Sequence, residues 1–254
     1  MERIQNQSPI RSAIRHPRSA MTRRSFLAAL GSGAAWIGGG AVVLAAEDDP
    51  RRPGQHRLEI GDADRDGVFY VPRSGTSDAA LPLWVVLHGA GGTGQSAAYV
   101  FPLADEFGVV VLAPDSRDER TWDGVLRNWG PDVEFMAAAV NRMTSLFTID
   151  RRRVTLAGFS DGASYALSLG ISYGDQFSRI VAMSPGVMQP MAARGKPRIF
   201  ISHGTSDAVM PIDETSRRFV PRLKALGYDV TYREYEGRHT VSPPIVREAF
   251  EWAR

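Results

Sequence analysis

Short apolar runs alternate with stretches of helical periodicity along most of the chain. Continuous apolar runs such as 83–87 are typical of strands buried on both faces of a sheet. Residues 135–147 place apolar side chains at helical spacing, and Pro131 is suited to the start of that helix. Because strands separated by helices require crossover connections, the pattern predicts an α/β fold with a mostly parallel central sheet and helices on both faces. The predicted strands are 83–87, 109–113, 154–157, 180–183, 199–201 and 230–235, preceded by a hairpin of 58–60 and 68–71.

The N-terminal residues differ from this pattern. Arg23 and Arg24 precede an uncharged stretch, 25–46, that is mildly hydrophobic and contains five glycines. This arrangement resembles a twin-arginine export signal, and small residues before Glu47 suit cleavage there. A retained membrane anchor is the alternative, which the glycines disfavour. We expect three segments: residues 1–46 are an extension with a twin-arginine-type signal, 47–57 are a linker, and 58–254 are the folded domain.

Such a signal predicts a protein that the twin-arginine export machinery carries to the periplasm or the extracellular space of a bacterium. Contact with the membrane is expected only through the signal segment, if that segment stays uncleaved. Residues 1–20 form a long prelude, so Met21 is an alternative to Met1 as the start of translation.

Composition excludes several kinds of site. The chain of 254 residues has no cysteine, which excludes disulfides, thiolate metal sites and a cysteine nucleophile. Residues 1–46 contain six arginines and one acid, so 24 basic and 27 acidic side chains remain in the rest. This balance gives no sign of a nucleic-acid-binding surface. No glycine-rich dinucleotide motif follows a strand, so we expect no cofactor, and the oligomeric state is left open.

An Asp-rich segment imitates the start of a calcium-binding loop. Residues 62–67 have the pattern D-x-D-x-D-G, but Arg73 stands where the loop would need a bidentate acid. A hairpin turn explains the Asp and Gly residues without a metal. We therefore predict a turn here, with calcium as the weaker alternative.

The strongest motif is G-x-S-x-G over residues 158–162. A β-branched run leads into it and a helical pattern of small residues follows, which is the strand–turn–helix context that the motif requires. Gly158 and Gly162 allow a close approach of strand and helix. The pattern predicts that Ser160 is a nucleophile held at a helix N-terminus. A structural turn is the alternative.

A second glycine-rich loop, 88–92, follows the strand predicted at 83–87. Its glycines let backbone N–H groups face a ligand, with the N–H of Ala90 as the first candidate donor and that of Gly91 as the second. The loop resembles the H-G-G-G-type oxyanion loop of esterases, and this resemblance implies an oxyanion hole that the N–H of Asp161 completes. A turn that only links a strand to a helix is the alternative.

The serine needs a base and an acid after it in the chain. Only His203 and His239 follow Ser160. The loop after the last predicted strand must return to the serine, so His239 is predicted as the base and Asp207 as the acid. Asp213 is the reserve acid, although it suits a helix cap, and His203 is expected to brace the acid loop.

The segment 115–131 follows a strand on the expected ligand side of the sheet and carries Trp122 and Trp129. We expect these tryptophans to form part of a substrate wall. The alternative is a surface loop that the two tryptophans pin down. Asp132 suits a helix cap better than a catalytic acid.

Residues 67–254 resemble the α/β-hydrolase superfamily. They are most similar to its compact, lidless group of carboxylesterases, phospholipase-type acylhydrolases and polyhydroxybutyrate-depolymerase-like esterases. The residues that carry the resemblance are 87–92, 113–116, 158–162, 203–207 and 237–239. The resemblance implies a serine carboxylesterase that cleaves small or medium acyl esters through Ser160, His239 and Asp207 without a metal. A peptidase or polyester depolymerase on the same triad and a non-catalytic binding module are the alternatives.

Overall fold

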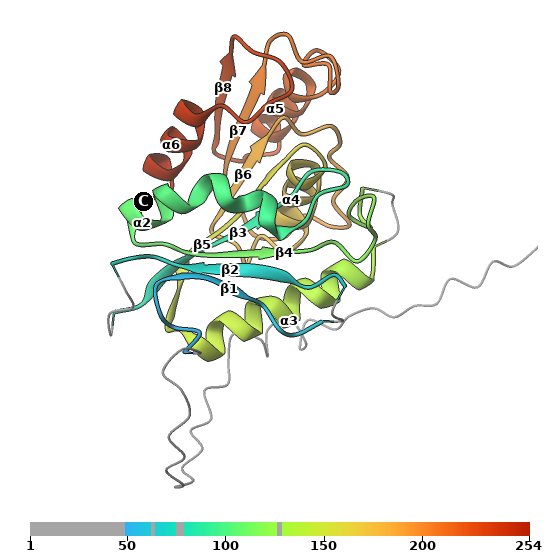
Figure 1. Cartoon of the computed structure of the whole chain (residues 1–254). Helices are drawn as coiled ribbons and strands as arrows, with labels where there is room; N and C mark the ends of the chain where they lie inside the picture. The colour runs from blue at the N-terminus through green and yellow to red at the C-terminus, as the bar shows by residue number, and fades with distance from the viewer. Residues whose placement is uncertain (1–48, 62–63, 75–78, 126–128) are drawn as a thin grey trace, which may run out of the picture.

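The computed structural model describes residues 49–61, 64–74, 79–125 and 129–254 (Figure 1). The predicted signal segment lies outside this part of the chain. Within the described ranges, no helix is long and apolar enough to cross a membrane.

The described chain folds around one sheet of eight strands, in the order β1-β2-β4-β3-β5-β6-β7-β8. β1 and β2 are antiparallel to their neighbours, whereas the pairs from β4 to β8 are parallel. The strands are β1 (Gly54–Arg57), β2 (Gly67–Val71), β3 (Leu81–Leu87), β4 (Val110–Pro114), β5 (Ile149–Phe159), β6 (Arg179–Met183), β7 (Arg198–Gly204) and β8 (Val230–Tyr235).

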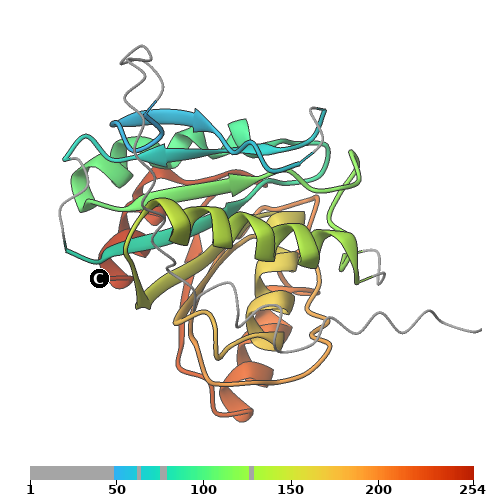
Figure 2. The ribbon, with the colours of Figure 1, turned by 90° about the horizontal axis from the view of Figure 1, so that it is seen from below.

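Helices cover both faces of this sheet (Figures 1 and 2). One face carries α3, α4 and α5, and the other carries the 3-10 helix η1, α2 and α6. This arrangement confirms the predicted α/β-hydrolase architecture. The helical elements are η1 (Gly94–Val100), α2 (Phe101–Phe107), α3 (Pro131–Leu146), α4 (Asp161–Ser172), α5 (Ser216–Ala225) and α6 (Pro243–Trp252).

The apolar strand runs supply the central layer of the core, and apolar residues of the helices pack against them. Leu83 and Val85 of β3 are fully buried on the α3 face. Trp84 points to the other face, where its ring stacks on Phe250 of α6 with centroids 3.8 Å apart. Because successive side chains of a strand point to opposite faces, an uninterrupted apolar run of this kind fills the core on both sides.

The first hairpin lies earlier in the chain than its apolar residues predict. β1 occupies Gly54–Arg57, inside the expected linker, and pairs antiparallel with β2. Residues 59–61, of which we expected 59 and 60 in the strand, bend around Asp66 and donate their three N–H groups to its carboxylate. The carboxylate therefore ends the strand pairing, because it replaces the partner strand as the acceptor of these groups.

The parallel strands bring four loops to one edge of the sheet. The loops after β3, β5, β7 and β8 begin at His88, Ser160, Thr205 and Glu236. Since parallel strands share the edge at which they end, the predicted site residues of these loops meet there.

Candidate active site

Ser160 sits in a strained turn between β5 and α4. Its φ of 57° and ψ of −121° lie in a region that residues with a side chain rarely adopt. A Cβ on Gly158 would lie 2.3 Å from the carbonyl group of Gly162, and one on Gly162 would lie 2.3 Å from the carbonyl oxygen of Leu87. Strand, turn and helix are thus too close for any other residue at either glycine. This geometry sets Ser160 at the N-terminus of α4.

A continuous line of hydrogen bonds joins the three residues that sequence reasoning selected. His239 Nε2 lies 2.8 Å from Ser160 Oγ, and His239 Nδ1 lies 2.7 Å from Asp207 Oδ2. Asp207 accepts through a carboxylate, so we assign the proton of the neutral imidazole to Nδ1 and leave Nε2 as the acceptor of the serine hydroxyl. The arrangement can take a proton from Ser160 and return it to a leaving group.

Asp207 is held as an anion despite its burial. Its side chain is fully buried, and burial alone would raise its pKa. Its Oδ1 accepts the N–H groups of Met210 and Val209, and its Oδ2 accepts from His239. These hydrogen bonds outweigh the burial and hold the pKa of Asp207 below its usual value.

His203 braces the acid loop, as expected from its position at the end of β7. Its ring is completely buried, with Nε2 2.8 Å from Met210 O and Nδ1 2.7 Å from Ser216 Oγ. Burial lowers the pKa of His203 and favours its neutral form. The reserve acid, Asp213, forms an exposed ion pair with Arg217.

Two backbone N–H groups are available beside Ser160. Those of Ala90 and Asp161 have no hydrogen-bond acceptor within the described residues. Gly91 differs, because its N–H donates to Arg120 O at 2.7 Å. The structure therefore removes Gly91 from the predicted oxyanion donors, since an N–H with a close backbone acceptor is not free for a ligand.

The two tryptophans occupy the core beneath the site. Trp122 is completely buried, and its Nε1 donates to His88 O at 2.9 Å. Trp129 is partly buried, and both indole rings stack on Tyr165 of α4 with centroids 5.2 Å apart. Trp122 thus pins the loop from inside, as in the alternative given above, and lies in the core in place of a substrate wall. Trp129 contributes to the same stack.

Asp132 is the second residue of α3, but another carboxylate caps that helix. Asp123 Oδ2 accepts the N–H groups of Gly130 and Asp132, while Asp132 accepts the N–H groups of Asp123 and Arg117. Burial raises the pKa of Asp132 to about 6 and also raises that of Asp123. The two side chains close the loop onto the start of α3.

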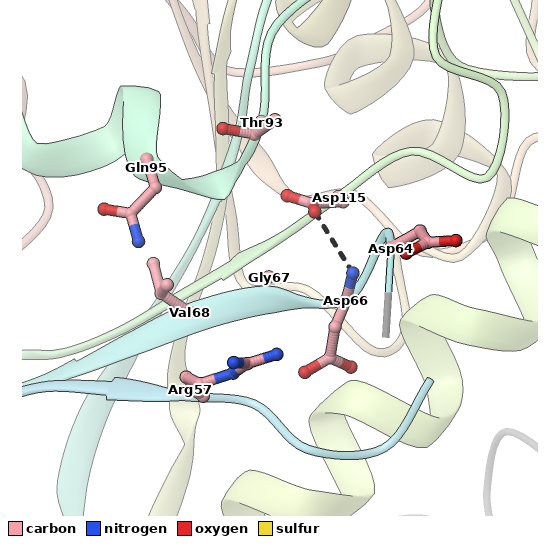
Figure 3. Close-up of a pocket in the computed structure, with 8 residues that line it drawn as sticks. All are labelled: Arg57, Asp64, Asp66, Gly67, Val68, Thr93, Gln95 and Asp115. Atoms are coloured by element: carbon pink, nitrogen blue, oxygen red, sulfur yellow. Dashed lines mark hydrogen bonds between the residues drawn. The ribbon is translucent and has the colours of Figure 1, made fainter. Parts of the chain in front are cut away.

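A depression of about 280 Å³ lies at the start of β2, and Ser160 is not among the residues that line it. Figure 3 shows these lining residues. Asp66 and Asp115 line the depression, but their carboxylates already accept backbone N–H groups, Asp115 those of Asp66 and Gly94. No group of three potential metal ligands occurs in the described part of the chain. The predicted turn explains the described acids of the calcium-like segment, whereas Asp62 lies outside the described residues.

Comparisons with known proteins relate this part of the chain to esterases. Residues 132–252, which include Ser160, Asp207 and His239, match the family model described as Phospholipase/Carboxylesterase. "Probable feruloyl esterase C" of Aspergillus clavatus is 25% identical over 158 residues, 59% of this chain and 57% of the relative. "Acyl-protein thioesterase 1" of Gibberella zeae is 27% identical over 112 residues, 40% of this chain and 47% of the relative. The chain thus spans about half the length of the curated relatives it matches.

Solved structures show the same fold. The crystal structure of esterase PE8 superposes with a TM-score of 0.61 and 23% sequence identity, covering 74% of this chain and 97% of that one. The likeness confirms the α/β-hydrolase fold. The names of the relatives agree with the predicted class of enzyme, an ester hydrolase.

Proposed function

We propose that the protein is a serine carboxylesterase that cleaves small or medium acyl esters through an acyl-enzyme. The observation that carries this proposal is the line of hydrogen bonds from Ser160 Oγ through His239 to Asp207. A serine hydroxyl is a weak nucleophile, and a histidine oriented by a carboxylate is the arrangement that activates it.

The reaction follows from the assigned protons. Ser160 Oγ attacks the ester carbonyl carbon while His239 Nε2 accepts the hydroxyl proton, and Asp207 stabilises the resulting imidazolium. The N–H groups of Ala90 and Asp161 stabilise the oxyanion, and the loss of one such donor typically costs about 2.7–4 kcal/mol. His239 then protonates the departing alkoxide. A water molecule, deprotonated by the same histidine, hydrolyses the acyl-enzyme.

The site is open, in agreement with the compact, lidless esterases that the sequence resembles, and this resemblance implies an ester of small or medium size. Ala90 and Gly91 are exposed, and every α-helix of the described chain is packed on the sheet, so none of them forms a lid. The matched family and the relatives named as esterases support an ester, whereas the relative named acyl-protein thioesterase carries the name of a thioester hydrolase.

The experiment is labelling of the full chain with a fluorophosphonate probe, followed by peptide mass mapping. We expect stoichiometric modification of Ser160, and none in Ser160→Ala or His239→Ala. A folded protein that does not react would refute the activated serine and favour the binding-module alternative. Turnover of short nitrophenyl esters, aminoacyl amides and insoluble polyester then separates the esterase from the peptidase and depolymerase alternatives.

We further propose that residues 1–46 direct export through the twin-arginine machinery. The support is the sequence alone: Arg23 and Arg24 ahead of the uncharged stretch 25–46. Replacing both arginines with lysine in the bacterial host should keep the protein in the cytoplasm, as measured by cell fractionation. Export of that variant at the normal level would contradict the proposal.

A further inference from the structure

Three consecutive residues of the loop after β4 contact both sides of the expected oxyanion hole. Arg120 O accepts the N–H of Gly91 at 2.7 Å. Thr121 Oγ1 donates to Asp161 Oδ2 at 2.6 Å. Trp122 Nε1 donates to His88 O at 2.9 Å. We call residues 120–122 the clamp.

Two of these bonds flank Ala90. His88 comes two residues before it and Gly91 comes directly after it, and each is tied to the clamp. Ala90 itself is exposed and makes no such contact. The Ala90 N–H lies in the plane of the Gly89–Ala90 peptide, whose carbonyl accepts the Gly92 N–H at 3.1 Å and lies 2.7 Å from His88 Nδ1. The clamp fixes His88 and Gly91 on the two sides of that peptide, and so helps to set the direction of the Ala90 N–H.

The third bond fixes the other donor. Asp161 is the first residue of α4, and its backbone N–H is the second expected oxyanion donor. Its carboxylate accepts the hydroxyl of Thr121, a residue that is itself 6% exposed. A hydrogen bond to a carboxylate in a partly buried place is stronger than one in open solvent, because less water competes for it. The side chain of Thr121 thus joins the two donor-bearing segments through one loop.

The clamp is anchored on both sides. Before it, Ser116 N donates to His88 Nε2 at 3.0 Å, and Arg65 binds Ser116 O and Gly92 O. Burial lowers the pKa of His88, which keeps its Nε2 free to accept. After the clamp, the backbone N–H of Asp123 donates to the Asp132 carboxylate, and that of Asp132 donates to the Asp123 carboxylate. The loop therefore has little freedom to follow a movement of either donor segment.

We propose that the clamp sets the geometry of the oxyanion hole and that Thr121 is its positioning residue, a proposal that rests on the proposed serine-esterase function. Thr121 acts through Asp161 and does not reach the reacting atoms. Stabilisation of the oxyanion depends on donors that are fixed before the charge develops. Loss of the Thr121 hydroxyl should therefore weaken binding of the transition state more than binding of the ester.

The test compares Thr121→Val, which keeps the shape but lacks the hydroxyl, with Thr121→Ser, which keeps the hydroxyl. For hydrolysis of a short nitrophenyl ester we expect kcat of Thr121→Val to fall about 10-fold, with KM changed less than about twofold. This loss of kcat is smaller than the roughly 10²- to 10³-fold loss that removal of a whole oxyanion donor causes, because the Asp161 N–H is displaced and not removed. The inhibition constant of a boronic-acid transition-state analogue should rise by the same factor as kcat falls. Thr121→Ser should restore both values.

A second arm measures coupling. Asp161→Ala removes the acceptor but keeps the backbone donor, and the double variant Thr121→Val/Asp161→Ala should lose no more kcat than the larger single loss. If Thr121→Val does not fold, Asp161→Ala against the wild type gives the same comparison. Additive losses, an effect on KM alone, or failure of Thr121→Ser to rescue would overturn the positioning role.

These outcomes are distinct from failure of the proposed function. Wild-type protein that hydrolyses esters and reacts with fluorophosphonate at Ser160, beside a Thr121→Val variant with unchanged kcat, would overturn the clamp alone. Folded wild-type protein without either activity would overturn the proposed function and the clamp with it.

Discussion

His203 Nε2 lies 3.2 Å from Asp207 Oδ2, the same oxygen that faces His239 Nδ1 at 2.7 Å. One carboxylate oxygen therefore has two imidazoles around it. His203 is buried and tied to Ser216 and Met210, so it cannot turn toward the serine. It holds the acid loop, and His239 is left as the base.

Replacement of His203 by phenylalanine keeps an aromatic ring but removes both nitrogens. We expect kcat for ester hydrolysis to fall about 10-fold with KM nearly unchanged, because Asp207 would be oriented less well. The midpoint of thermal unfolding should also fall, since Ser216 and Met210 would lose a buried partner. Steady-state kinetics and calorimetry check both effects.

His56→Phe is the matched control. His56 lies on the edge strand β1, with its Nε2 2.8 Å from Arg52 O and its ring stacked on Phe69. It should leave kcat unchanged. A loss of kcat in His56→Phe as large as in His203→Phe would show that the effect is not specific to the acid loop.

Asp207→Asn tests the acid directly. An amide at this position cannot stabilise the imidazolium, and it favours the wrong tautomer of His239, so kcat should fall by about 10³- to 10⁴-fold. The reserve acid supplies the control: Asp213→Asn removes an exposed ion pair with Arg217 and should retain at least half of the activity. The opposite order of the two variants would assign the acid to Asp213.

The loops of the triad were predictable because each one follows a strand that the sequence indicates. Parallel strands end at one edge of the sheet, so residues separated by 79 positions, such as Ser160 and His239, meet without any local signal between them. The turn at Ser160 was predictable from Gly158 and Gly162, because only glycine fits where strand and helix approach so closely.

Other features could not be predicted from residue types. The N–H of Gly91 donates to the backbone carbonyl of Arg120. Every residue has a backbone carbonyl, so the sequence does not show which one accepts this N–H. Trp122 has a ring suited equally to a core or to a substrate wall, and only the fold decides between them. β1 has no apolar run because it is an edge strand, so its Gly54–Arg57 segment looked like a linker.

The buried carboxyl group of Asp132, which is hydrogen-bonded to the Asp123 N–H, predicts an effect of pH on stability. Burial raises the pKa of Asp132 from 3.8 to about 6, so between about pH 4 and pH 6 the folded state binds more protons at this residue than the unfolded state. The contribution of Asp132 to the free energy of unfolding therefore decreases as the pH rises through this window. Above pH 7 it should be constant.

Asp132→Asn cannot ionise and removes this dependence. We expect the stability of the wild type relative to the variant to decrease as the pH rises from 4 to 6, measured by urea unfolding at several pH values. Asp207 acts in the opposite sense, since its lowered pKa contributes stability that is lost as the pH falls, but it is present in both proteins. A difference between the two proteins that stays constant from pH 4 to 7 would contradict the raised pKa.

Three serines on one side of α4 hold the segment that follows β6. Ser164, Ser168 and Ser172 are buried, and each donates its hydroxyl to the carbonyl four residues earlier. Each Oγ also accepts N–H groups from residues 186–191, as Ser168 does from Gln189 at 2.9 Å. This segment leads from the sheet past the acid loop, where a Cβ on Gly186 would lie 2.3 Å from Met210 Sδ.

Ser168→Ala should therefore lower the free energy of unfolding more than an ordinary Ser→Ala substitution in a helix does. It leaves the N–H of Gln189 without its acceptor in a partly buried place, which should lower the free energy of unfolding by about 1–3 kcal/mol, measured by urea unfolding. Ser145→Ala is the control, because that hydroxyl is exposed and donates only to a carbonyl of its own helix, at Arg142. It should change stability by less than about 0.5 kcal/mol. Equal effects of the two substitutions would mean that the serines of α4 do not hold the segment, whereas a loss confined to Ser168→Ala, with kcat kept, would assign them a role in stability and not in the chemistry.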